Sequence, residues 1–574
     1  MRVTNGMMRT NSMLNMQKNK IAYDKYLQQY NTQKKIQRPS DDPTIAVRAL
    51  KYRTTLAEIE QFQRNIEDAT SWMDATETAI KDVDKVMDSM VEYVTQAATG
   101  TVNAKDREDI NKQLDQYAQY IYEQDMNADY AGRYLFTGYR TDSALLFDKA
   151  QDNVTYTIHE QLEVSNVRKY DYVYGRAEIG KMPTSDTNVV AGKTYYTKDA
   201  TTGEYTKVAT PVDSDINTYY EDKDAQAYAN EAPKFQSTNR ILVSYQDLID
   251  KGDSLTTNFD PPVNEYGSTT SVSSVPGPYI VFKDKNGNEF IKQVTIKRIE
   301  DDNVYNEHLQ PGADDVFLIP ETGELVFGDD IYDTIRGGSD LAITYQKKEF
   351  DKNDIKPEHY FVCEALDSNG KSWVYNTDKE NLNDGDLFNN FTPRPQDIKY
   401  QINFSQTIKV NTEGFKAVGT IVGRSIEDIK NSCNELDIIE ARMSEVVKRI
   451  SDLDEGADAD EIANLTELKS QLQTQMDLQK SVLVKSLGAM ITTIQGAKDK
   501  INVALADHGS RYNRMVMTRN KIEELEIDTN QAKSDNEDAD IGEAYINFTE
   551  SNLLYQATLN ATSKVLGQSL LDFI

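Results

Sequence analysis

The sequence predicts an α+β multidomain protein: N- and C-terminal helical arms pair into a long coiled-coil-like rod that carries a central β-rich inserted domain. Three observations predict it, namely where the 14 prolines lie, how apolar residues are spaced at both ends, and where turn dipeptides recur. Pro39 and Pro43 come early, and the others lie between Pro183 and Pro395. Because a proline costs about 3 kcal/mol inside a helix, the proline-free arms favour helix.

The N-terminal arm carries an unbroken heptad pattern. From residue 66 the apolar positions follow a 3-4-3-4 spacing in which Thr76 is the polar exception: Ile66, Ala69, Met73, Thr76, Ile80, Val83, Met87, Met90, Val94 and Ala97. Such spacing is typical of the seam of a coiled-coil helix. After a turn at Gly100 we expect a second helix, whose apolar face is formed by Ile110, Leu114, Tyr117, Ile121 and Ala128.

The C-terminal arm shows two similar runs on either side of an acidic connector, DEGADADE (454–461). Glu440 is the charged interruption of the first run, which contains Ile426, Ile429, Cys433, Leu436, Met443, Val447 and Ile450. The second run contains Leu483, Leu487, Met490, Ile494, Ala497, Ile501, Ala504 and His508. An ordinary antiparallel bundle and a single rod of paired N- and C-terminal arms are both compatible with these stripes, which do not choose partners.

The middle of the chain, residues 148–410, has the pattern of β-hairpins. Turn dipeptides recur at Asn286-Gly287, Asn369-Gly370 and Asp384-Gly385, next to short β-branched or aromatic runs such as PYIVF (278–282) and KSWVYN (371–376). A Tyr/Thr-rich segment, residues 192–209, predicts a further hairpin with Thr202-Gly203 in its turn. We expect a β-rich surface insertion made of one or two subdomains.

Composition excludes several classes of function. The formal net charge of −31 argues against a nucleic-acid partner and against an anionic membrane surface, because both require a basic face. The N-terminus has no apolar run of signal-peptide type, and no 18-residue apolar stretch occurs that could span a membrane. Two cysteines, Cys363 and Cys433, make neither a disulfide framework nor a metal motif.

Fragments of catalytic motifs lack their partners. GDSL (252–255) has no Asp-x-x-His, since Tyr156, Tyr305, Lys356 and Leu505 stand three residues before the four histidines. NGKS (369–372) lacks the first glycine of a phosphate-binding loop, and DKNGNE (284–289) has Glu289 where a calcium loop needs glycine. We therefore expect no catalytic residue, no cofactor and no metal site, and no enzyme.

A sharp break interrupts the N-terminal helical pattern at QRPSDDPTI (37–45). Pro39 disfavours helix at the preceding residue, so a first helix should end near Ile36. Ser40 and Asp41 suit a short turn, Asp42 is a good N-cap, and Pro43 occupies the favoured first helical position. These five residues predict an elbow between two helices.

Four stretches resemble one protein family. RPSDDPTIAVRAL (38–50) resembles the elbow of the flagellar hook-associated protein 3 family, of the flagellin superfamily, and QAATGTVNAKDR (96–107) resembles its interhelical turn. GRYLFTGYRT (132–141) is similar to the family signature Gly-Arg-Tyr-Leu-Phe-Ser-Gly, here Gly132, Arg133, Tyr134, Leu135, Phe136 and Gly138. The tail 537–574 is similar to the shared end of flagellins and junction proteins. The resemblance covers about 1–147 and 400–574, and it lapses in the middle.

The resemblance implies a flagellin-like layering. Residues 1–38 and 537–574 would form paired helices of an inner, tube-lining layer; 39–147 and 411–536 would form the rod arms; 148–410 would face solvent. The implied assembly positions are Met13, Met16, Tyr23, Leu27, Tyr30, Leu554, Ala557, Ala561, Val565, Leu571 and Phe573. Each end is short of apolar area, so we expect it to be disordered in the monomer and to fold on assembly.

The family also implies a structural role and partners. The chain would be an adaptor that joins the hook, through the first hook-associated protein, to the flagellin filament, in a ring of like subunits. It would be exported unfolded, without a cleavable signal, to the extracellular flagellum after binding a cytoplasmic export chaperone. A flagellin-type filament subunit is the alternative, and a surface binding domain for a ligand or glycan on such a scaffold is a third possibility.

Overall fold

A computed structural model of the chain describes residues 5–99, 103–175, 178–180, 188–190, 195–198, 205–219, 226–228, 233–249, 257–269, 271–275, 277–299, 309–338, 340–377, 387–453 and 459–571. The chain forms two compact units. The first contains Met1–Ser71, Lys399–Val410 and Gly509–Ile574; the second contains Trp72–Ile398 and Asn411–His508.

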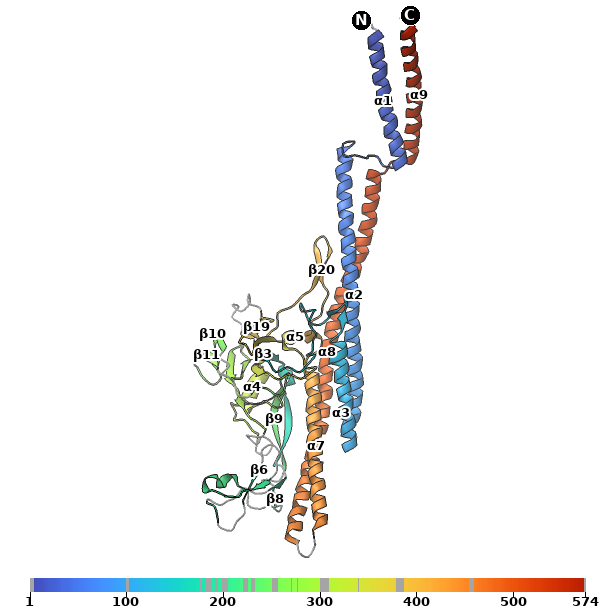
Figure 1. The fold of residues 1–574 in the computed structure, drawn as a ribbon. Helices are drawn as coiled ribbons and strands as arrows, with labels where there is room; N and C mark the ends of the chain where they lie inside the picture. Colours follow the sequence, from blue (N-terminus) through green and yellow to red (C-terminus); the bar gives the residue numbers. More distant parts are fainter. Residues whose placement is uncertain are drawn as a thin grey trace. The chain divides into compact units, whose positions relative to one another are not determined.

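Long helices make up both ends of the chain, and a β-rich region lies between them in the sequence (Figure 1). The described helices are α1 (Asn5–Thr32), α2 (Pro43–Thr99), α3 (Ala104–Ala118), α4 (Asp329–Gly337), α5 (Pro357–Tyr360), α6 (Gly414–Ala417), α7 (Ile421–Asp452), α8 (Ala459–Glu537) and α9 (Ile541–Leu571). This order confirms the predicted α+β class with helical arms around a β-rich insertion. The first helix ends at Thr32, earlier than the expected Ile36, and Gln33 takes a left-handed φ of 56° just after it.

In the first unit, α2 and α8 run antiparallel. Asn536 donates to the Ile45 carbonyl, Gln63 donates to Glu526 at 2.6 Å, and Thr70 faces the sulfur of Met515. A hairpin of β20 (Lys399–Asn403) and β21 (Gln406–Lys409) lies against this pair, where the ring of Phe404 meets that of Phe62 edge to face at 5.0 Å. The N- and C-terminal arms therefore pair with each other here.

In the second unit, α2 and α8 are again antiparallel, and α3 and α7 pack beside them. Lys498 of α8 bridges Asp84 and Asp88 of α2, and Lys430 of α7 bridges Asp115 of α3. The predicted N-terminal seam is confirmed, since its residues from Ile66 to Val94 are all at most 1% exposed. The second C-terminal run is confirmed as well, because all its residues from Leu483 to His508 are buried.

Three details of the predicted seams are corrected. In α7 the buried positions after Leu436 are Ile439 and Val446, whereas Val447 is 42% exposed and Glu440 is half-buried. Beyond Leu436 the helix packs against Leu465, Leu468 and Leu472 of α8, and this contact buries Ile439 and Val446 instead. Ala128 lies beyond the helical segment, which ends as a π-turn at Asp125. Helix α8 begins within the expected connector, of which 454–458 lie outside the described residues.

The insertion is built from two sheets of the second unit. An eight-stranded sheet has the order β11-β10-β13-β12-β17-β3-β18-β19, and a five-stranded sheet has the order β14-β15-β16-β9-β4. The longer described strands are β3 (Val154–Leu162), β4 (Arg168–Tyr174), β9 (Lys234–Leu242), β10 (Thr257–Glu265) and β17 (Leu341–Lys347). The others are β11 (Ser271–Val275), β12 (Tyr279–Lys283), β13 (Glu289–Gln293), β14 (Thr295–Ile296), β15 (Val316–Ile319), β16 (Glu324–Phe327), β18 (Val362–Asp367) and β19 (Ser372–Tyr375).

Short hairpins accompany the sheets, and the turn dipeptides lie where the sequence predicts them. Gly287 and Gly370 take φ values of 82° and 79° in the turns β12–β13 and β18–β19, so both Asn-Gly pairs close hairpins. Strands β6 (Tyr196–Lys198) and β7 (Tyr205–Lys207) form the predicted Tyr/Thr-rich hairpin. Its turn, the GDSL segment and Asp384-Gly385 lie outside the described residues.

Candidate assembly interface

Helices α1 and α9 pack antiparallel through a ladder of aromatic rings. Tyr23 lies between Phe548 and Tyr555 with ring centroids 5.6 and 5.7 Å apart, and Tyr30 lies between Tyr545 and Phe548 at 5.7 and 5.9 Å. Aromatic pairs at such distances contribute about 0.5–1.5 kcal/mol each beyond the burial of their area. The pairing therefore depends on a few rings rather than on a continuous apolar core.

The seam between the two helices also contains small and polar residues. Asn19 donates to the hydroxyl of Thr558 at 2.6 Å, and Ala544, Ser551 and Thr562 are buried. The spacing of residues 544, 548, 551, 555, 558 and 562 is 4-3-4-3-4, which is a heptad seam. Sequence reasoning missed it because only apolar positions were counted. A pattern that admits aromatic and small polar residues would have found it.

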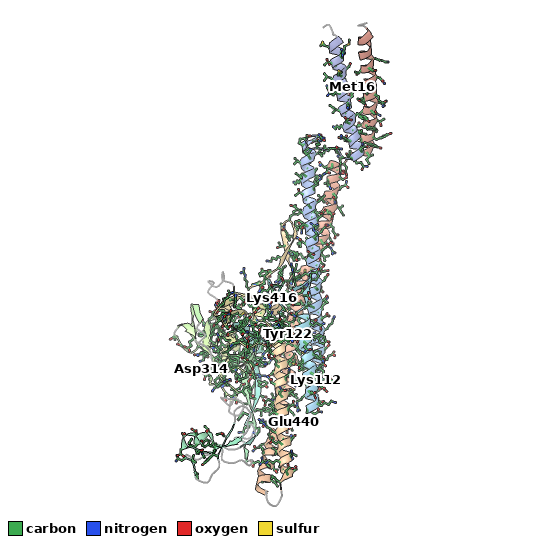
Figure 2. All side chains as sticks on the ribbon, in the orientation of Figure 1. Met16, Lys112, Tyr122, Asp314, Lys416 and Glu440 are labelled. Carbon is green, nitrogen blue, oxygen red and sulfur yellow. The ribbon has the colours of Figure 1, made fainter. Side chains whose placement is uncertain are left out.

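The predicted assembly positions divide between this seam and the opposite faces. Met16, Tyr23 and Leu27 are half-buried, and Met16 is labelled on α1 in Figure 2. Met13, Tyr30 and Leu554 are 53%, 37% and 52% exposed, and Ala557 and Ala561 are also exposed. The side chains of Val565 and Leu571, and residue Phe573, lie outside the described residues.

Both helices expose large apolar side chains away from their shared seam. On α1 these are Met7, Met8, Met13, Leu14 and Ile21. On α9 they are Ile541, Ile546, Leu553, Leu554 and Leu559, with Leu553 at 64% and Ile546 at 63%. Single exposed apolar residues are ordinary on a protein surface, but a run of them along paired helices is typical of an interaction face. We call this run the exposed apolar face of α1 and α9.

The elbow residues, 39–43, follow α1 and form a hydrogen-bonded turn that leads into α2. The carboxylate of Asp41 accepts from the backbone N–H groups of Gln37 and Arg38, and the Arg38 and Gln37 bonds lower its pKa. Asp42 accepts from the N–H groups of Thr44 and Ile45 at 2.9 and 3.2 Å, as an N-cap does. Pro39, Ser40 and Pro43 are exposed, and Pro43 is the first residue of α2.

A charged cluster connects the end of α8 to Lys34, just after α1, and to Arg53 of α2. The side chain of Glu537 is 4% exposed and accepts two bonds from Arg53, at 2.9 and 2.8 Å. Lys34 bridges Glu537 and Asp538 at 3.5 and 2.5 Å. The Arg53 bonds lower the pKa of Glu537, and the Lys34 bond lowers the pKa of Asp538. Two backbone bonds, Lys35 N to Glu537 O and Ala539 N to Gln33 O, complete the joint.

The signature residues 132–138 form a packed corner of the second unit. Leu135 and Phe136 are 1% exposed, Tyr134 is half-buried and Arg133 is exposed. Gly132 and Gly138 have φ values of 76° and 63°, a region that favours glycine, and a Cβ on Gly138 would collide with the side chain of Gln396. The Phe136 carbonyl accepts from Gly414 N at 2.9 Å. The geometry of this stretch is that of a packing element.

The described residues contain no group of His, Cys, Asp or Glu side chains that could hold a metal ion. No helix in the described ranges is both long enough and apolar enough to cross a membrane. The described histidines lie apart from one another: burial lowers the pKa of His159 to about 4 and that of His359 to about 3. Cys363 and Cys433 are buried free thiols.

Family models match both helical ends of the chain. The bacterial flagellin N-terminal helical region matches residues 3–141, and the bacterial flagellin C-terminal helical region matches residues 491–574. Neither match includes the β-rich insertion. The two matched regions contain the elbow, the signature and all the positions of the exposed apolar face.

Curated relatives carry the name flagellar hook-associated protein 3. The protein of Salmonella typhimurium is 27% identical over 150 residues, which are 26% of this chain and 47% of that protein. The protein of Escherichia coli is 26% identical over 144 residues, 25% of this chain and 45% of that protein. The chain thus spans about half the length of the curated relatives it matches.

Among solved structures, FlgL of Xanthomonas campestris is 11% identical, with 84% of this chain and 99% of that chain covered. Its TM-score of 0.30 is too low for a common overall arrangement to be inferred. The helical-region matches and the named relatives agree with each other and with the observed order of helical arms around an insertion. The chain carries a flagellin-type helical region at each end, and it is similar to relatives named flagellar hook-associated protein 3.

Proposed function

We propose that this chain is a structural adaptor of the bacterial flagellum that joins the hook, through the first hook-associated protein, to the flagellin filament. The observation that carries the proposal is the exposed apolar face of α1 and α9. The two helices hold each other through aromatic rings and polar side chains, which leaves most of their larger aliphatic side chains without intramolecular cover. Such a face is suited to contacts with helices of like subunits.

The same face supports self-association into a ring and contact with two different neighbours. Leu553, Leu554 and Ile546 lie on α9, and Leu14 and Ile21 lie on α1, so one helical pair offers apolar surface from two chain ends. Burial of one such side chain contributes roughly 1.5–3 kcal/mol, so several together can hold a subunit in a lattice. Apolar contacts at this face would also order α1 and α9 on assembly.

An export chaperone is proposed as a partner before assembly. The seams 426–450 and 483–508 are its candidate targets by sequence, but Ile426, Leu436, Leu483 and Leu487 are buried in the folded chain. A chaperone would therefore reach these seams only while the chain is unfolded. This condition agrees with export of an unfolded chain through the flagellar channel to the extracellular structure.

Immunogold electron microscopy of intact cells tests the location. An antibody raised to residues 183–395 should label one band between hook and filament, because an adaptor occurs at the junction alone. Label along the whole filament would instead identify a flagellin-type subunit, the alternative reading of the same fold.

A pair of matched variants tests the exposed apolar face. We expect Leu554→Gln to leave monomer stability within about 0.5 kcal/mol, because the side chain is exposed, while cells lose the junction label. Glu550→Gln changes an exposed polar residue on the same helix and should keep the label. Normal labelling in Leu554→Gln cells would contradict the role given to this face.

A further inference from the structure

A cavity of about 100 Å³ lies in the second unit, where the five-stranded sheet meets α7 and α8. Strands β4 and β9 contribute one wall, and residues 482–493 of α8 contribute the other. A cavity needs roughly 10–15 Å³ of such volume to hold one water molecule, so this one has room for a polyatomic ion. Its lining is cationic although the whole chain has a net charge of −31.

The charges that line the cavity do not balance. Arg168, Lys169, Arg240 and Lys485 face two carboxylates, Asp171 and Asp428. Each carboxylate already has its own cation: Lys485 bridges Asp171 at 2.5 Å, and Arg240 bridges Asp428 at 2.7 Å. Arg240 also bonds Glu324 at 2.5 Å and lies over the ring of Tyr170. Arg168 and Lys169 remain; the side chain of Lys169 is exposed, whereas that of Arg168 is half-buried.

Arg168 is held in place but is not neutralised. One of its terminal N–H groups donates to the carbonyl of Ala489 on α8. Among the described residues no carboxylate lies within ion-pair distance of it, and its other N–H groups have no protein acceptor. Burial and the neighbouring Arg240 lower the pKa of Arg168, and the carboxylate of Asp428, which is itself paired with Arg240, offsets this only in part.

A second polar group in the lining points to a ligand independently. Ser486 is 7% exposed, and its hydroxyl, which is buried, has no hydrogen-bond partner among the described residues. A buried hydroxyl without a partner is unfavourable by about 1–3 kcal/mol. Ser486 is on α8, three residues before Ala489, the acceptor that anchors Arg168. A donor hydroxyl and a guanidinium with no carboxylate at ion-pair distance therefore line the same small space.

We propose that this cavity is a binding site for a small inorganic oxyanion of the phosphate or sulfate type, held by Arg168 and Ser486. The planar guanidinium offers paired N–H donors that match two oxygens of such an ion, and the serine hydroxyl donates to a third. The ion supplies the counter-charge that Arg168 lacks. Because Arg168 is on β4 and Ser486 is on α8, the bound ion fastens the inserted sheet to the helices. This inference does not depend on the proposed flagellar role.

Isothermal titration calorimetry on the full chain tests the site. Sodium phosphate and sodium sulfate are titrated separately at constant ionic strength, with sodium chloride as the control salt. We expect saturable binding of phosphate, sulfate or both, and none of chloride. Arg168→Gln should weaken it by about 10-fold or more, and Ser486→Ala by several-fold, since each removes hydrogen bonds to a charged ligand. Arg394→Gln, at an exposed arginine of the same insertion, should bind like the wild type.

Two results would overturn the proposal. One is the lack of saturable binding of either oxyanion by the wild type; the other is equal binding by wild type, Arg168→Gln and Ser486→Ala. The melting temperature of the four proteins in each salt is a second measurement. Sulfate and phosphate stabilise proteins in general because they are excluded from protein surfaces, so an equal rise in all four proteins counts against the site. Ser486→Ala removes only a hydroxyl, so it decides the matter even if Arg168→Gln fails to fold.

Discussion

Arg107 is a buried charge whose partners come from a distant part of the chain. Its side chain is fully buried, and its guanidinium bonds Asp437 at 2.5 and 2.9 Å and Glu440 at 2.6 and 3.0 Å. Burial disfavours the charge, but the bonds to Glu440 and Asp437 prevail and raise the pKa. Glu440, which is labelled in Figure 2, interrupts the apolar run of α7 and has a structural role, because its bond to Arg107 connects α7 to α3.

We expect Arg107→Ala to lower the free energy of unfolding by about 1–3 kcal/mol, measured as a shift of the urea transition. The loss should be below that of a wholly buried pair, because Asp437 and Glu440 are 52% and 31% exposed and water can reach them. Lys112→Ala is the matched control on α3: its pair with Glu108 is exposed, so the change should be within about 0.5 kcal/mol. Equal effects of the two variants would contradict this account.

His359 gives the insertion an acid-sensitive element. It is 4% exposed, its Nε2 lies 3.1 Å from the Ala144 carbonyl, and burial, with Lys356 and Arg140 nearby, lowers its pKa from 6.5 to about 3. The folded state therefore binds this proton more weakly than the unfolded state does. The associated stability is complete above pH 6.5 and is lost as the pH falls below that value towards the folded pKa.

At pH 5 this loss amounts to about 2 kcal/mol relative to pH 7. We expect His359→Gln, whose amide can still donate to the Ala144 carbonyl, to show a smaller drop in unfolding free energy between pH 7 and pH 5. Urea unfolding at both values measures the difference, and other titrating groups cancel between wild type and variant. The same drop in both proteins would show that His359 does not titrate as described.

At the scale of elements, α1 and α9 differ from the rest of the helical arms in how little they bury. Among the described side chains of α1, none is fully buried, whereas the seam of α2 from Ile66 to Val94 is at most 1% exposed. Helix stability in proteins comes mostly from packing of one face. The two terminal helices therefore have few contacts that favour folding before a partner covers their exposed face.

We expect amide exchange of the monomer to show weak protection in 5–32 and 541–571 and strong protection in 66–94. Tyr23→Ala, which removes a ring that touches both Phe548 and Tyr555, should reduce the residual protection of the terminal helices further. Protection of 5–32 as strong as that of 66–94 would contradict ordering on assembly.

At the scale of the whole molecule, the two compact units differ in what stabilises them. The first unit includes the aromatic seam of α1 and α9 and the charged joint at Glu537. The second unit contains both large sheets, with cores such as Tyr279, Val281, Ile291 and Ala342, all at most 1% exposed. Units with different cores need not unfold together.

Scanning calorimetry should therefore show at least two transitions. We expect Tyr23→Ala to move the lower one and to leave the upper one unchanged, because the rings that Tyr23 meets among the described residues, Phe548 and Tyr555, belong to the first unit. A single transition whose calorimetric and van't Hoff enthalpies agree would mean that the chain unfolds as one cooperative body.

The sequence by itself determined the class of fold, the arms and the elbow. Proline placement, the 3-4 spacing from Ile66 and the Asn-Gly turns are local signals, and each depends only on neighbours along the chain. Asp42 as N-cap followed by Pro43 is likewise a local rule, and the structure shows those bonds. The seam of α9 was also present in the spacing, once Ser551, Tyr555 and Thr562 are admitted as seam residues.

Only the tertiary structure decided which charged residues are paired and which are not. The bond of Glu440 to Arg107, the burial of Glu537 beside Arg53, and the unpaired Arg168 near Ser486 each involve residues hundreds of positions apart or on different elements. A chain with 94 acidic and 63 basic side chains offers far too many pairings for spacing to select. Folding selects them, because the energy of a charge depends on its burial and on the few groups within several ångströms, which are set by the packing of distant segments.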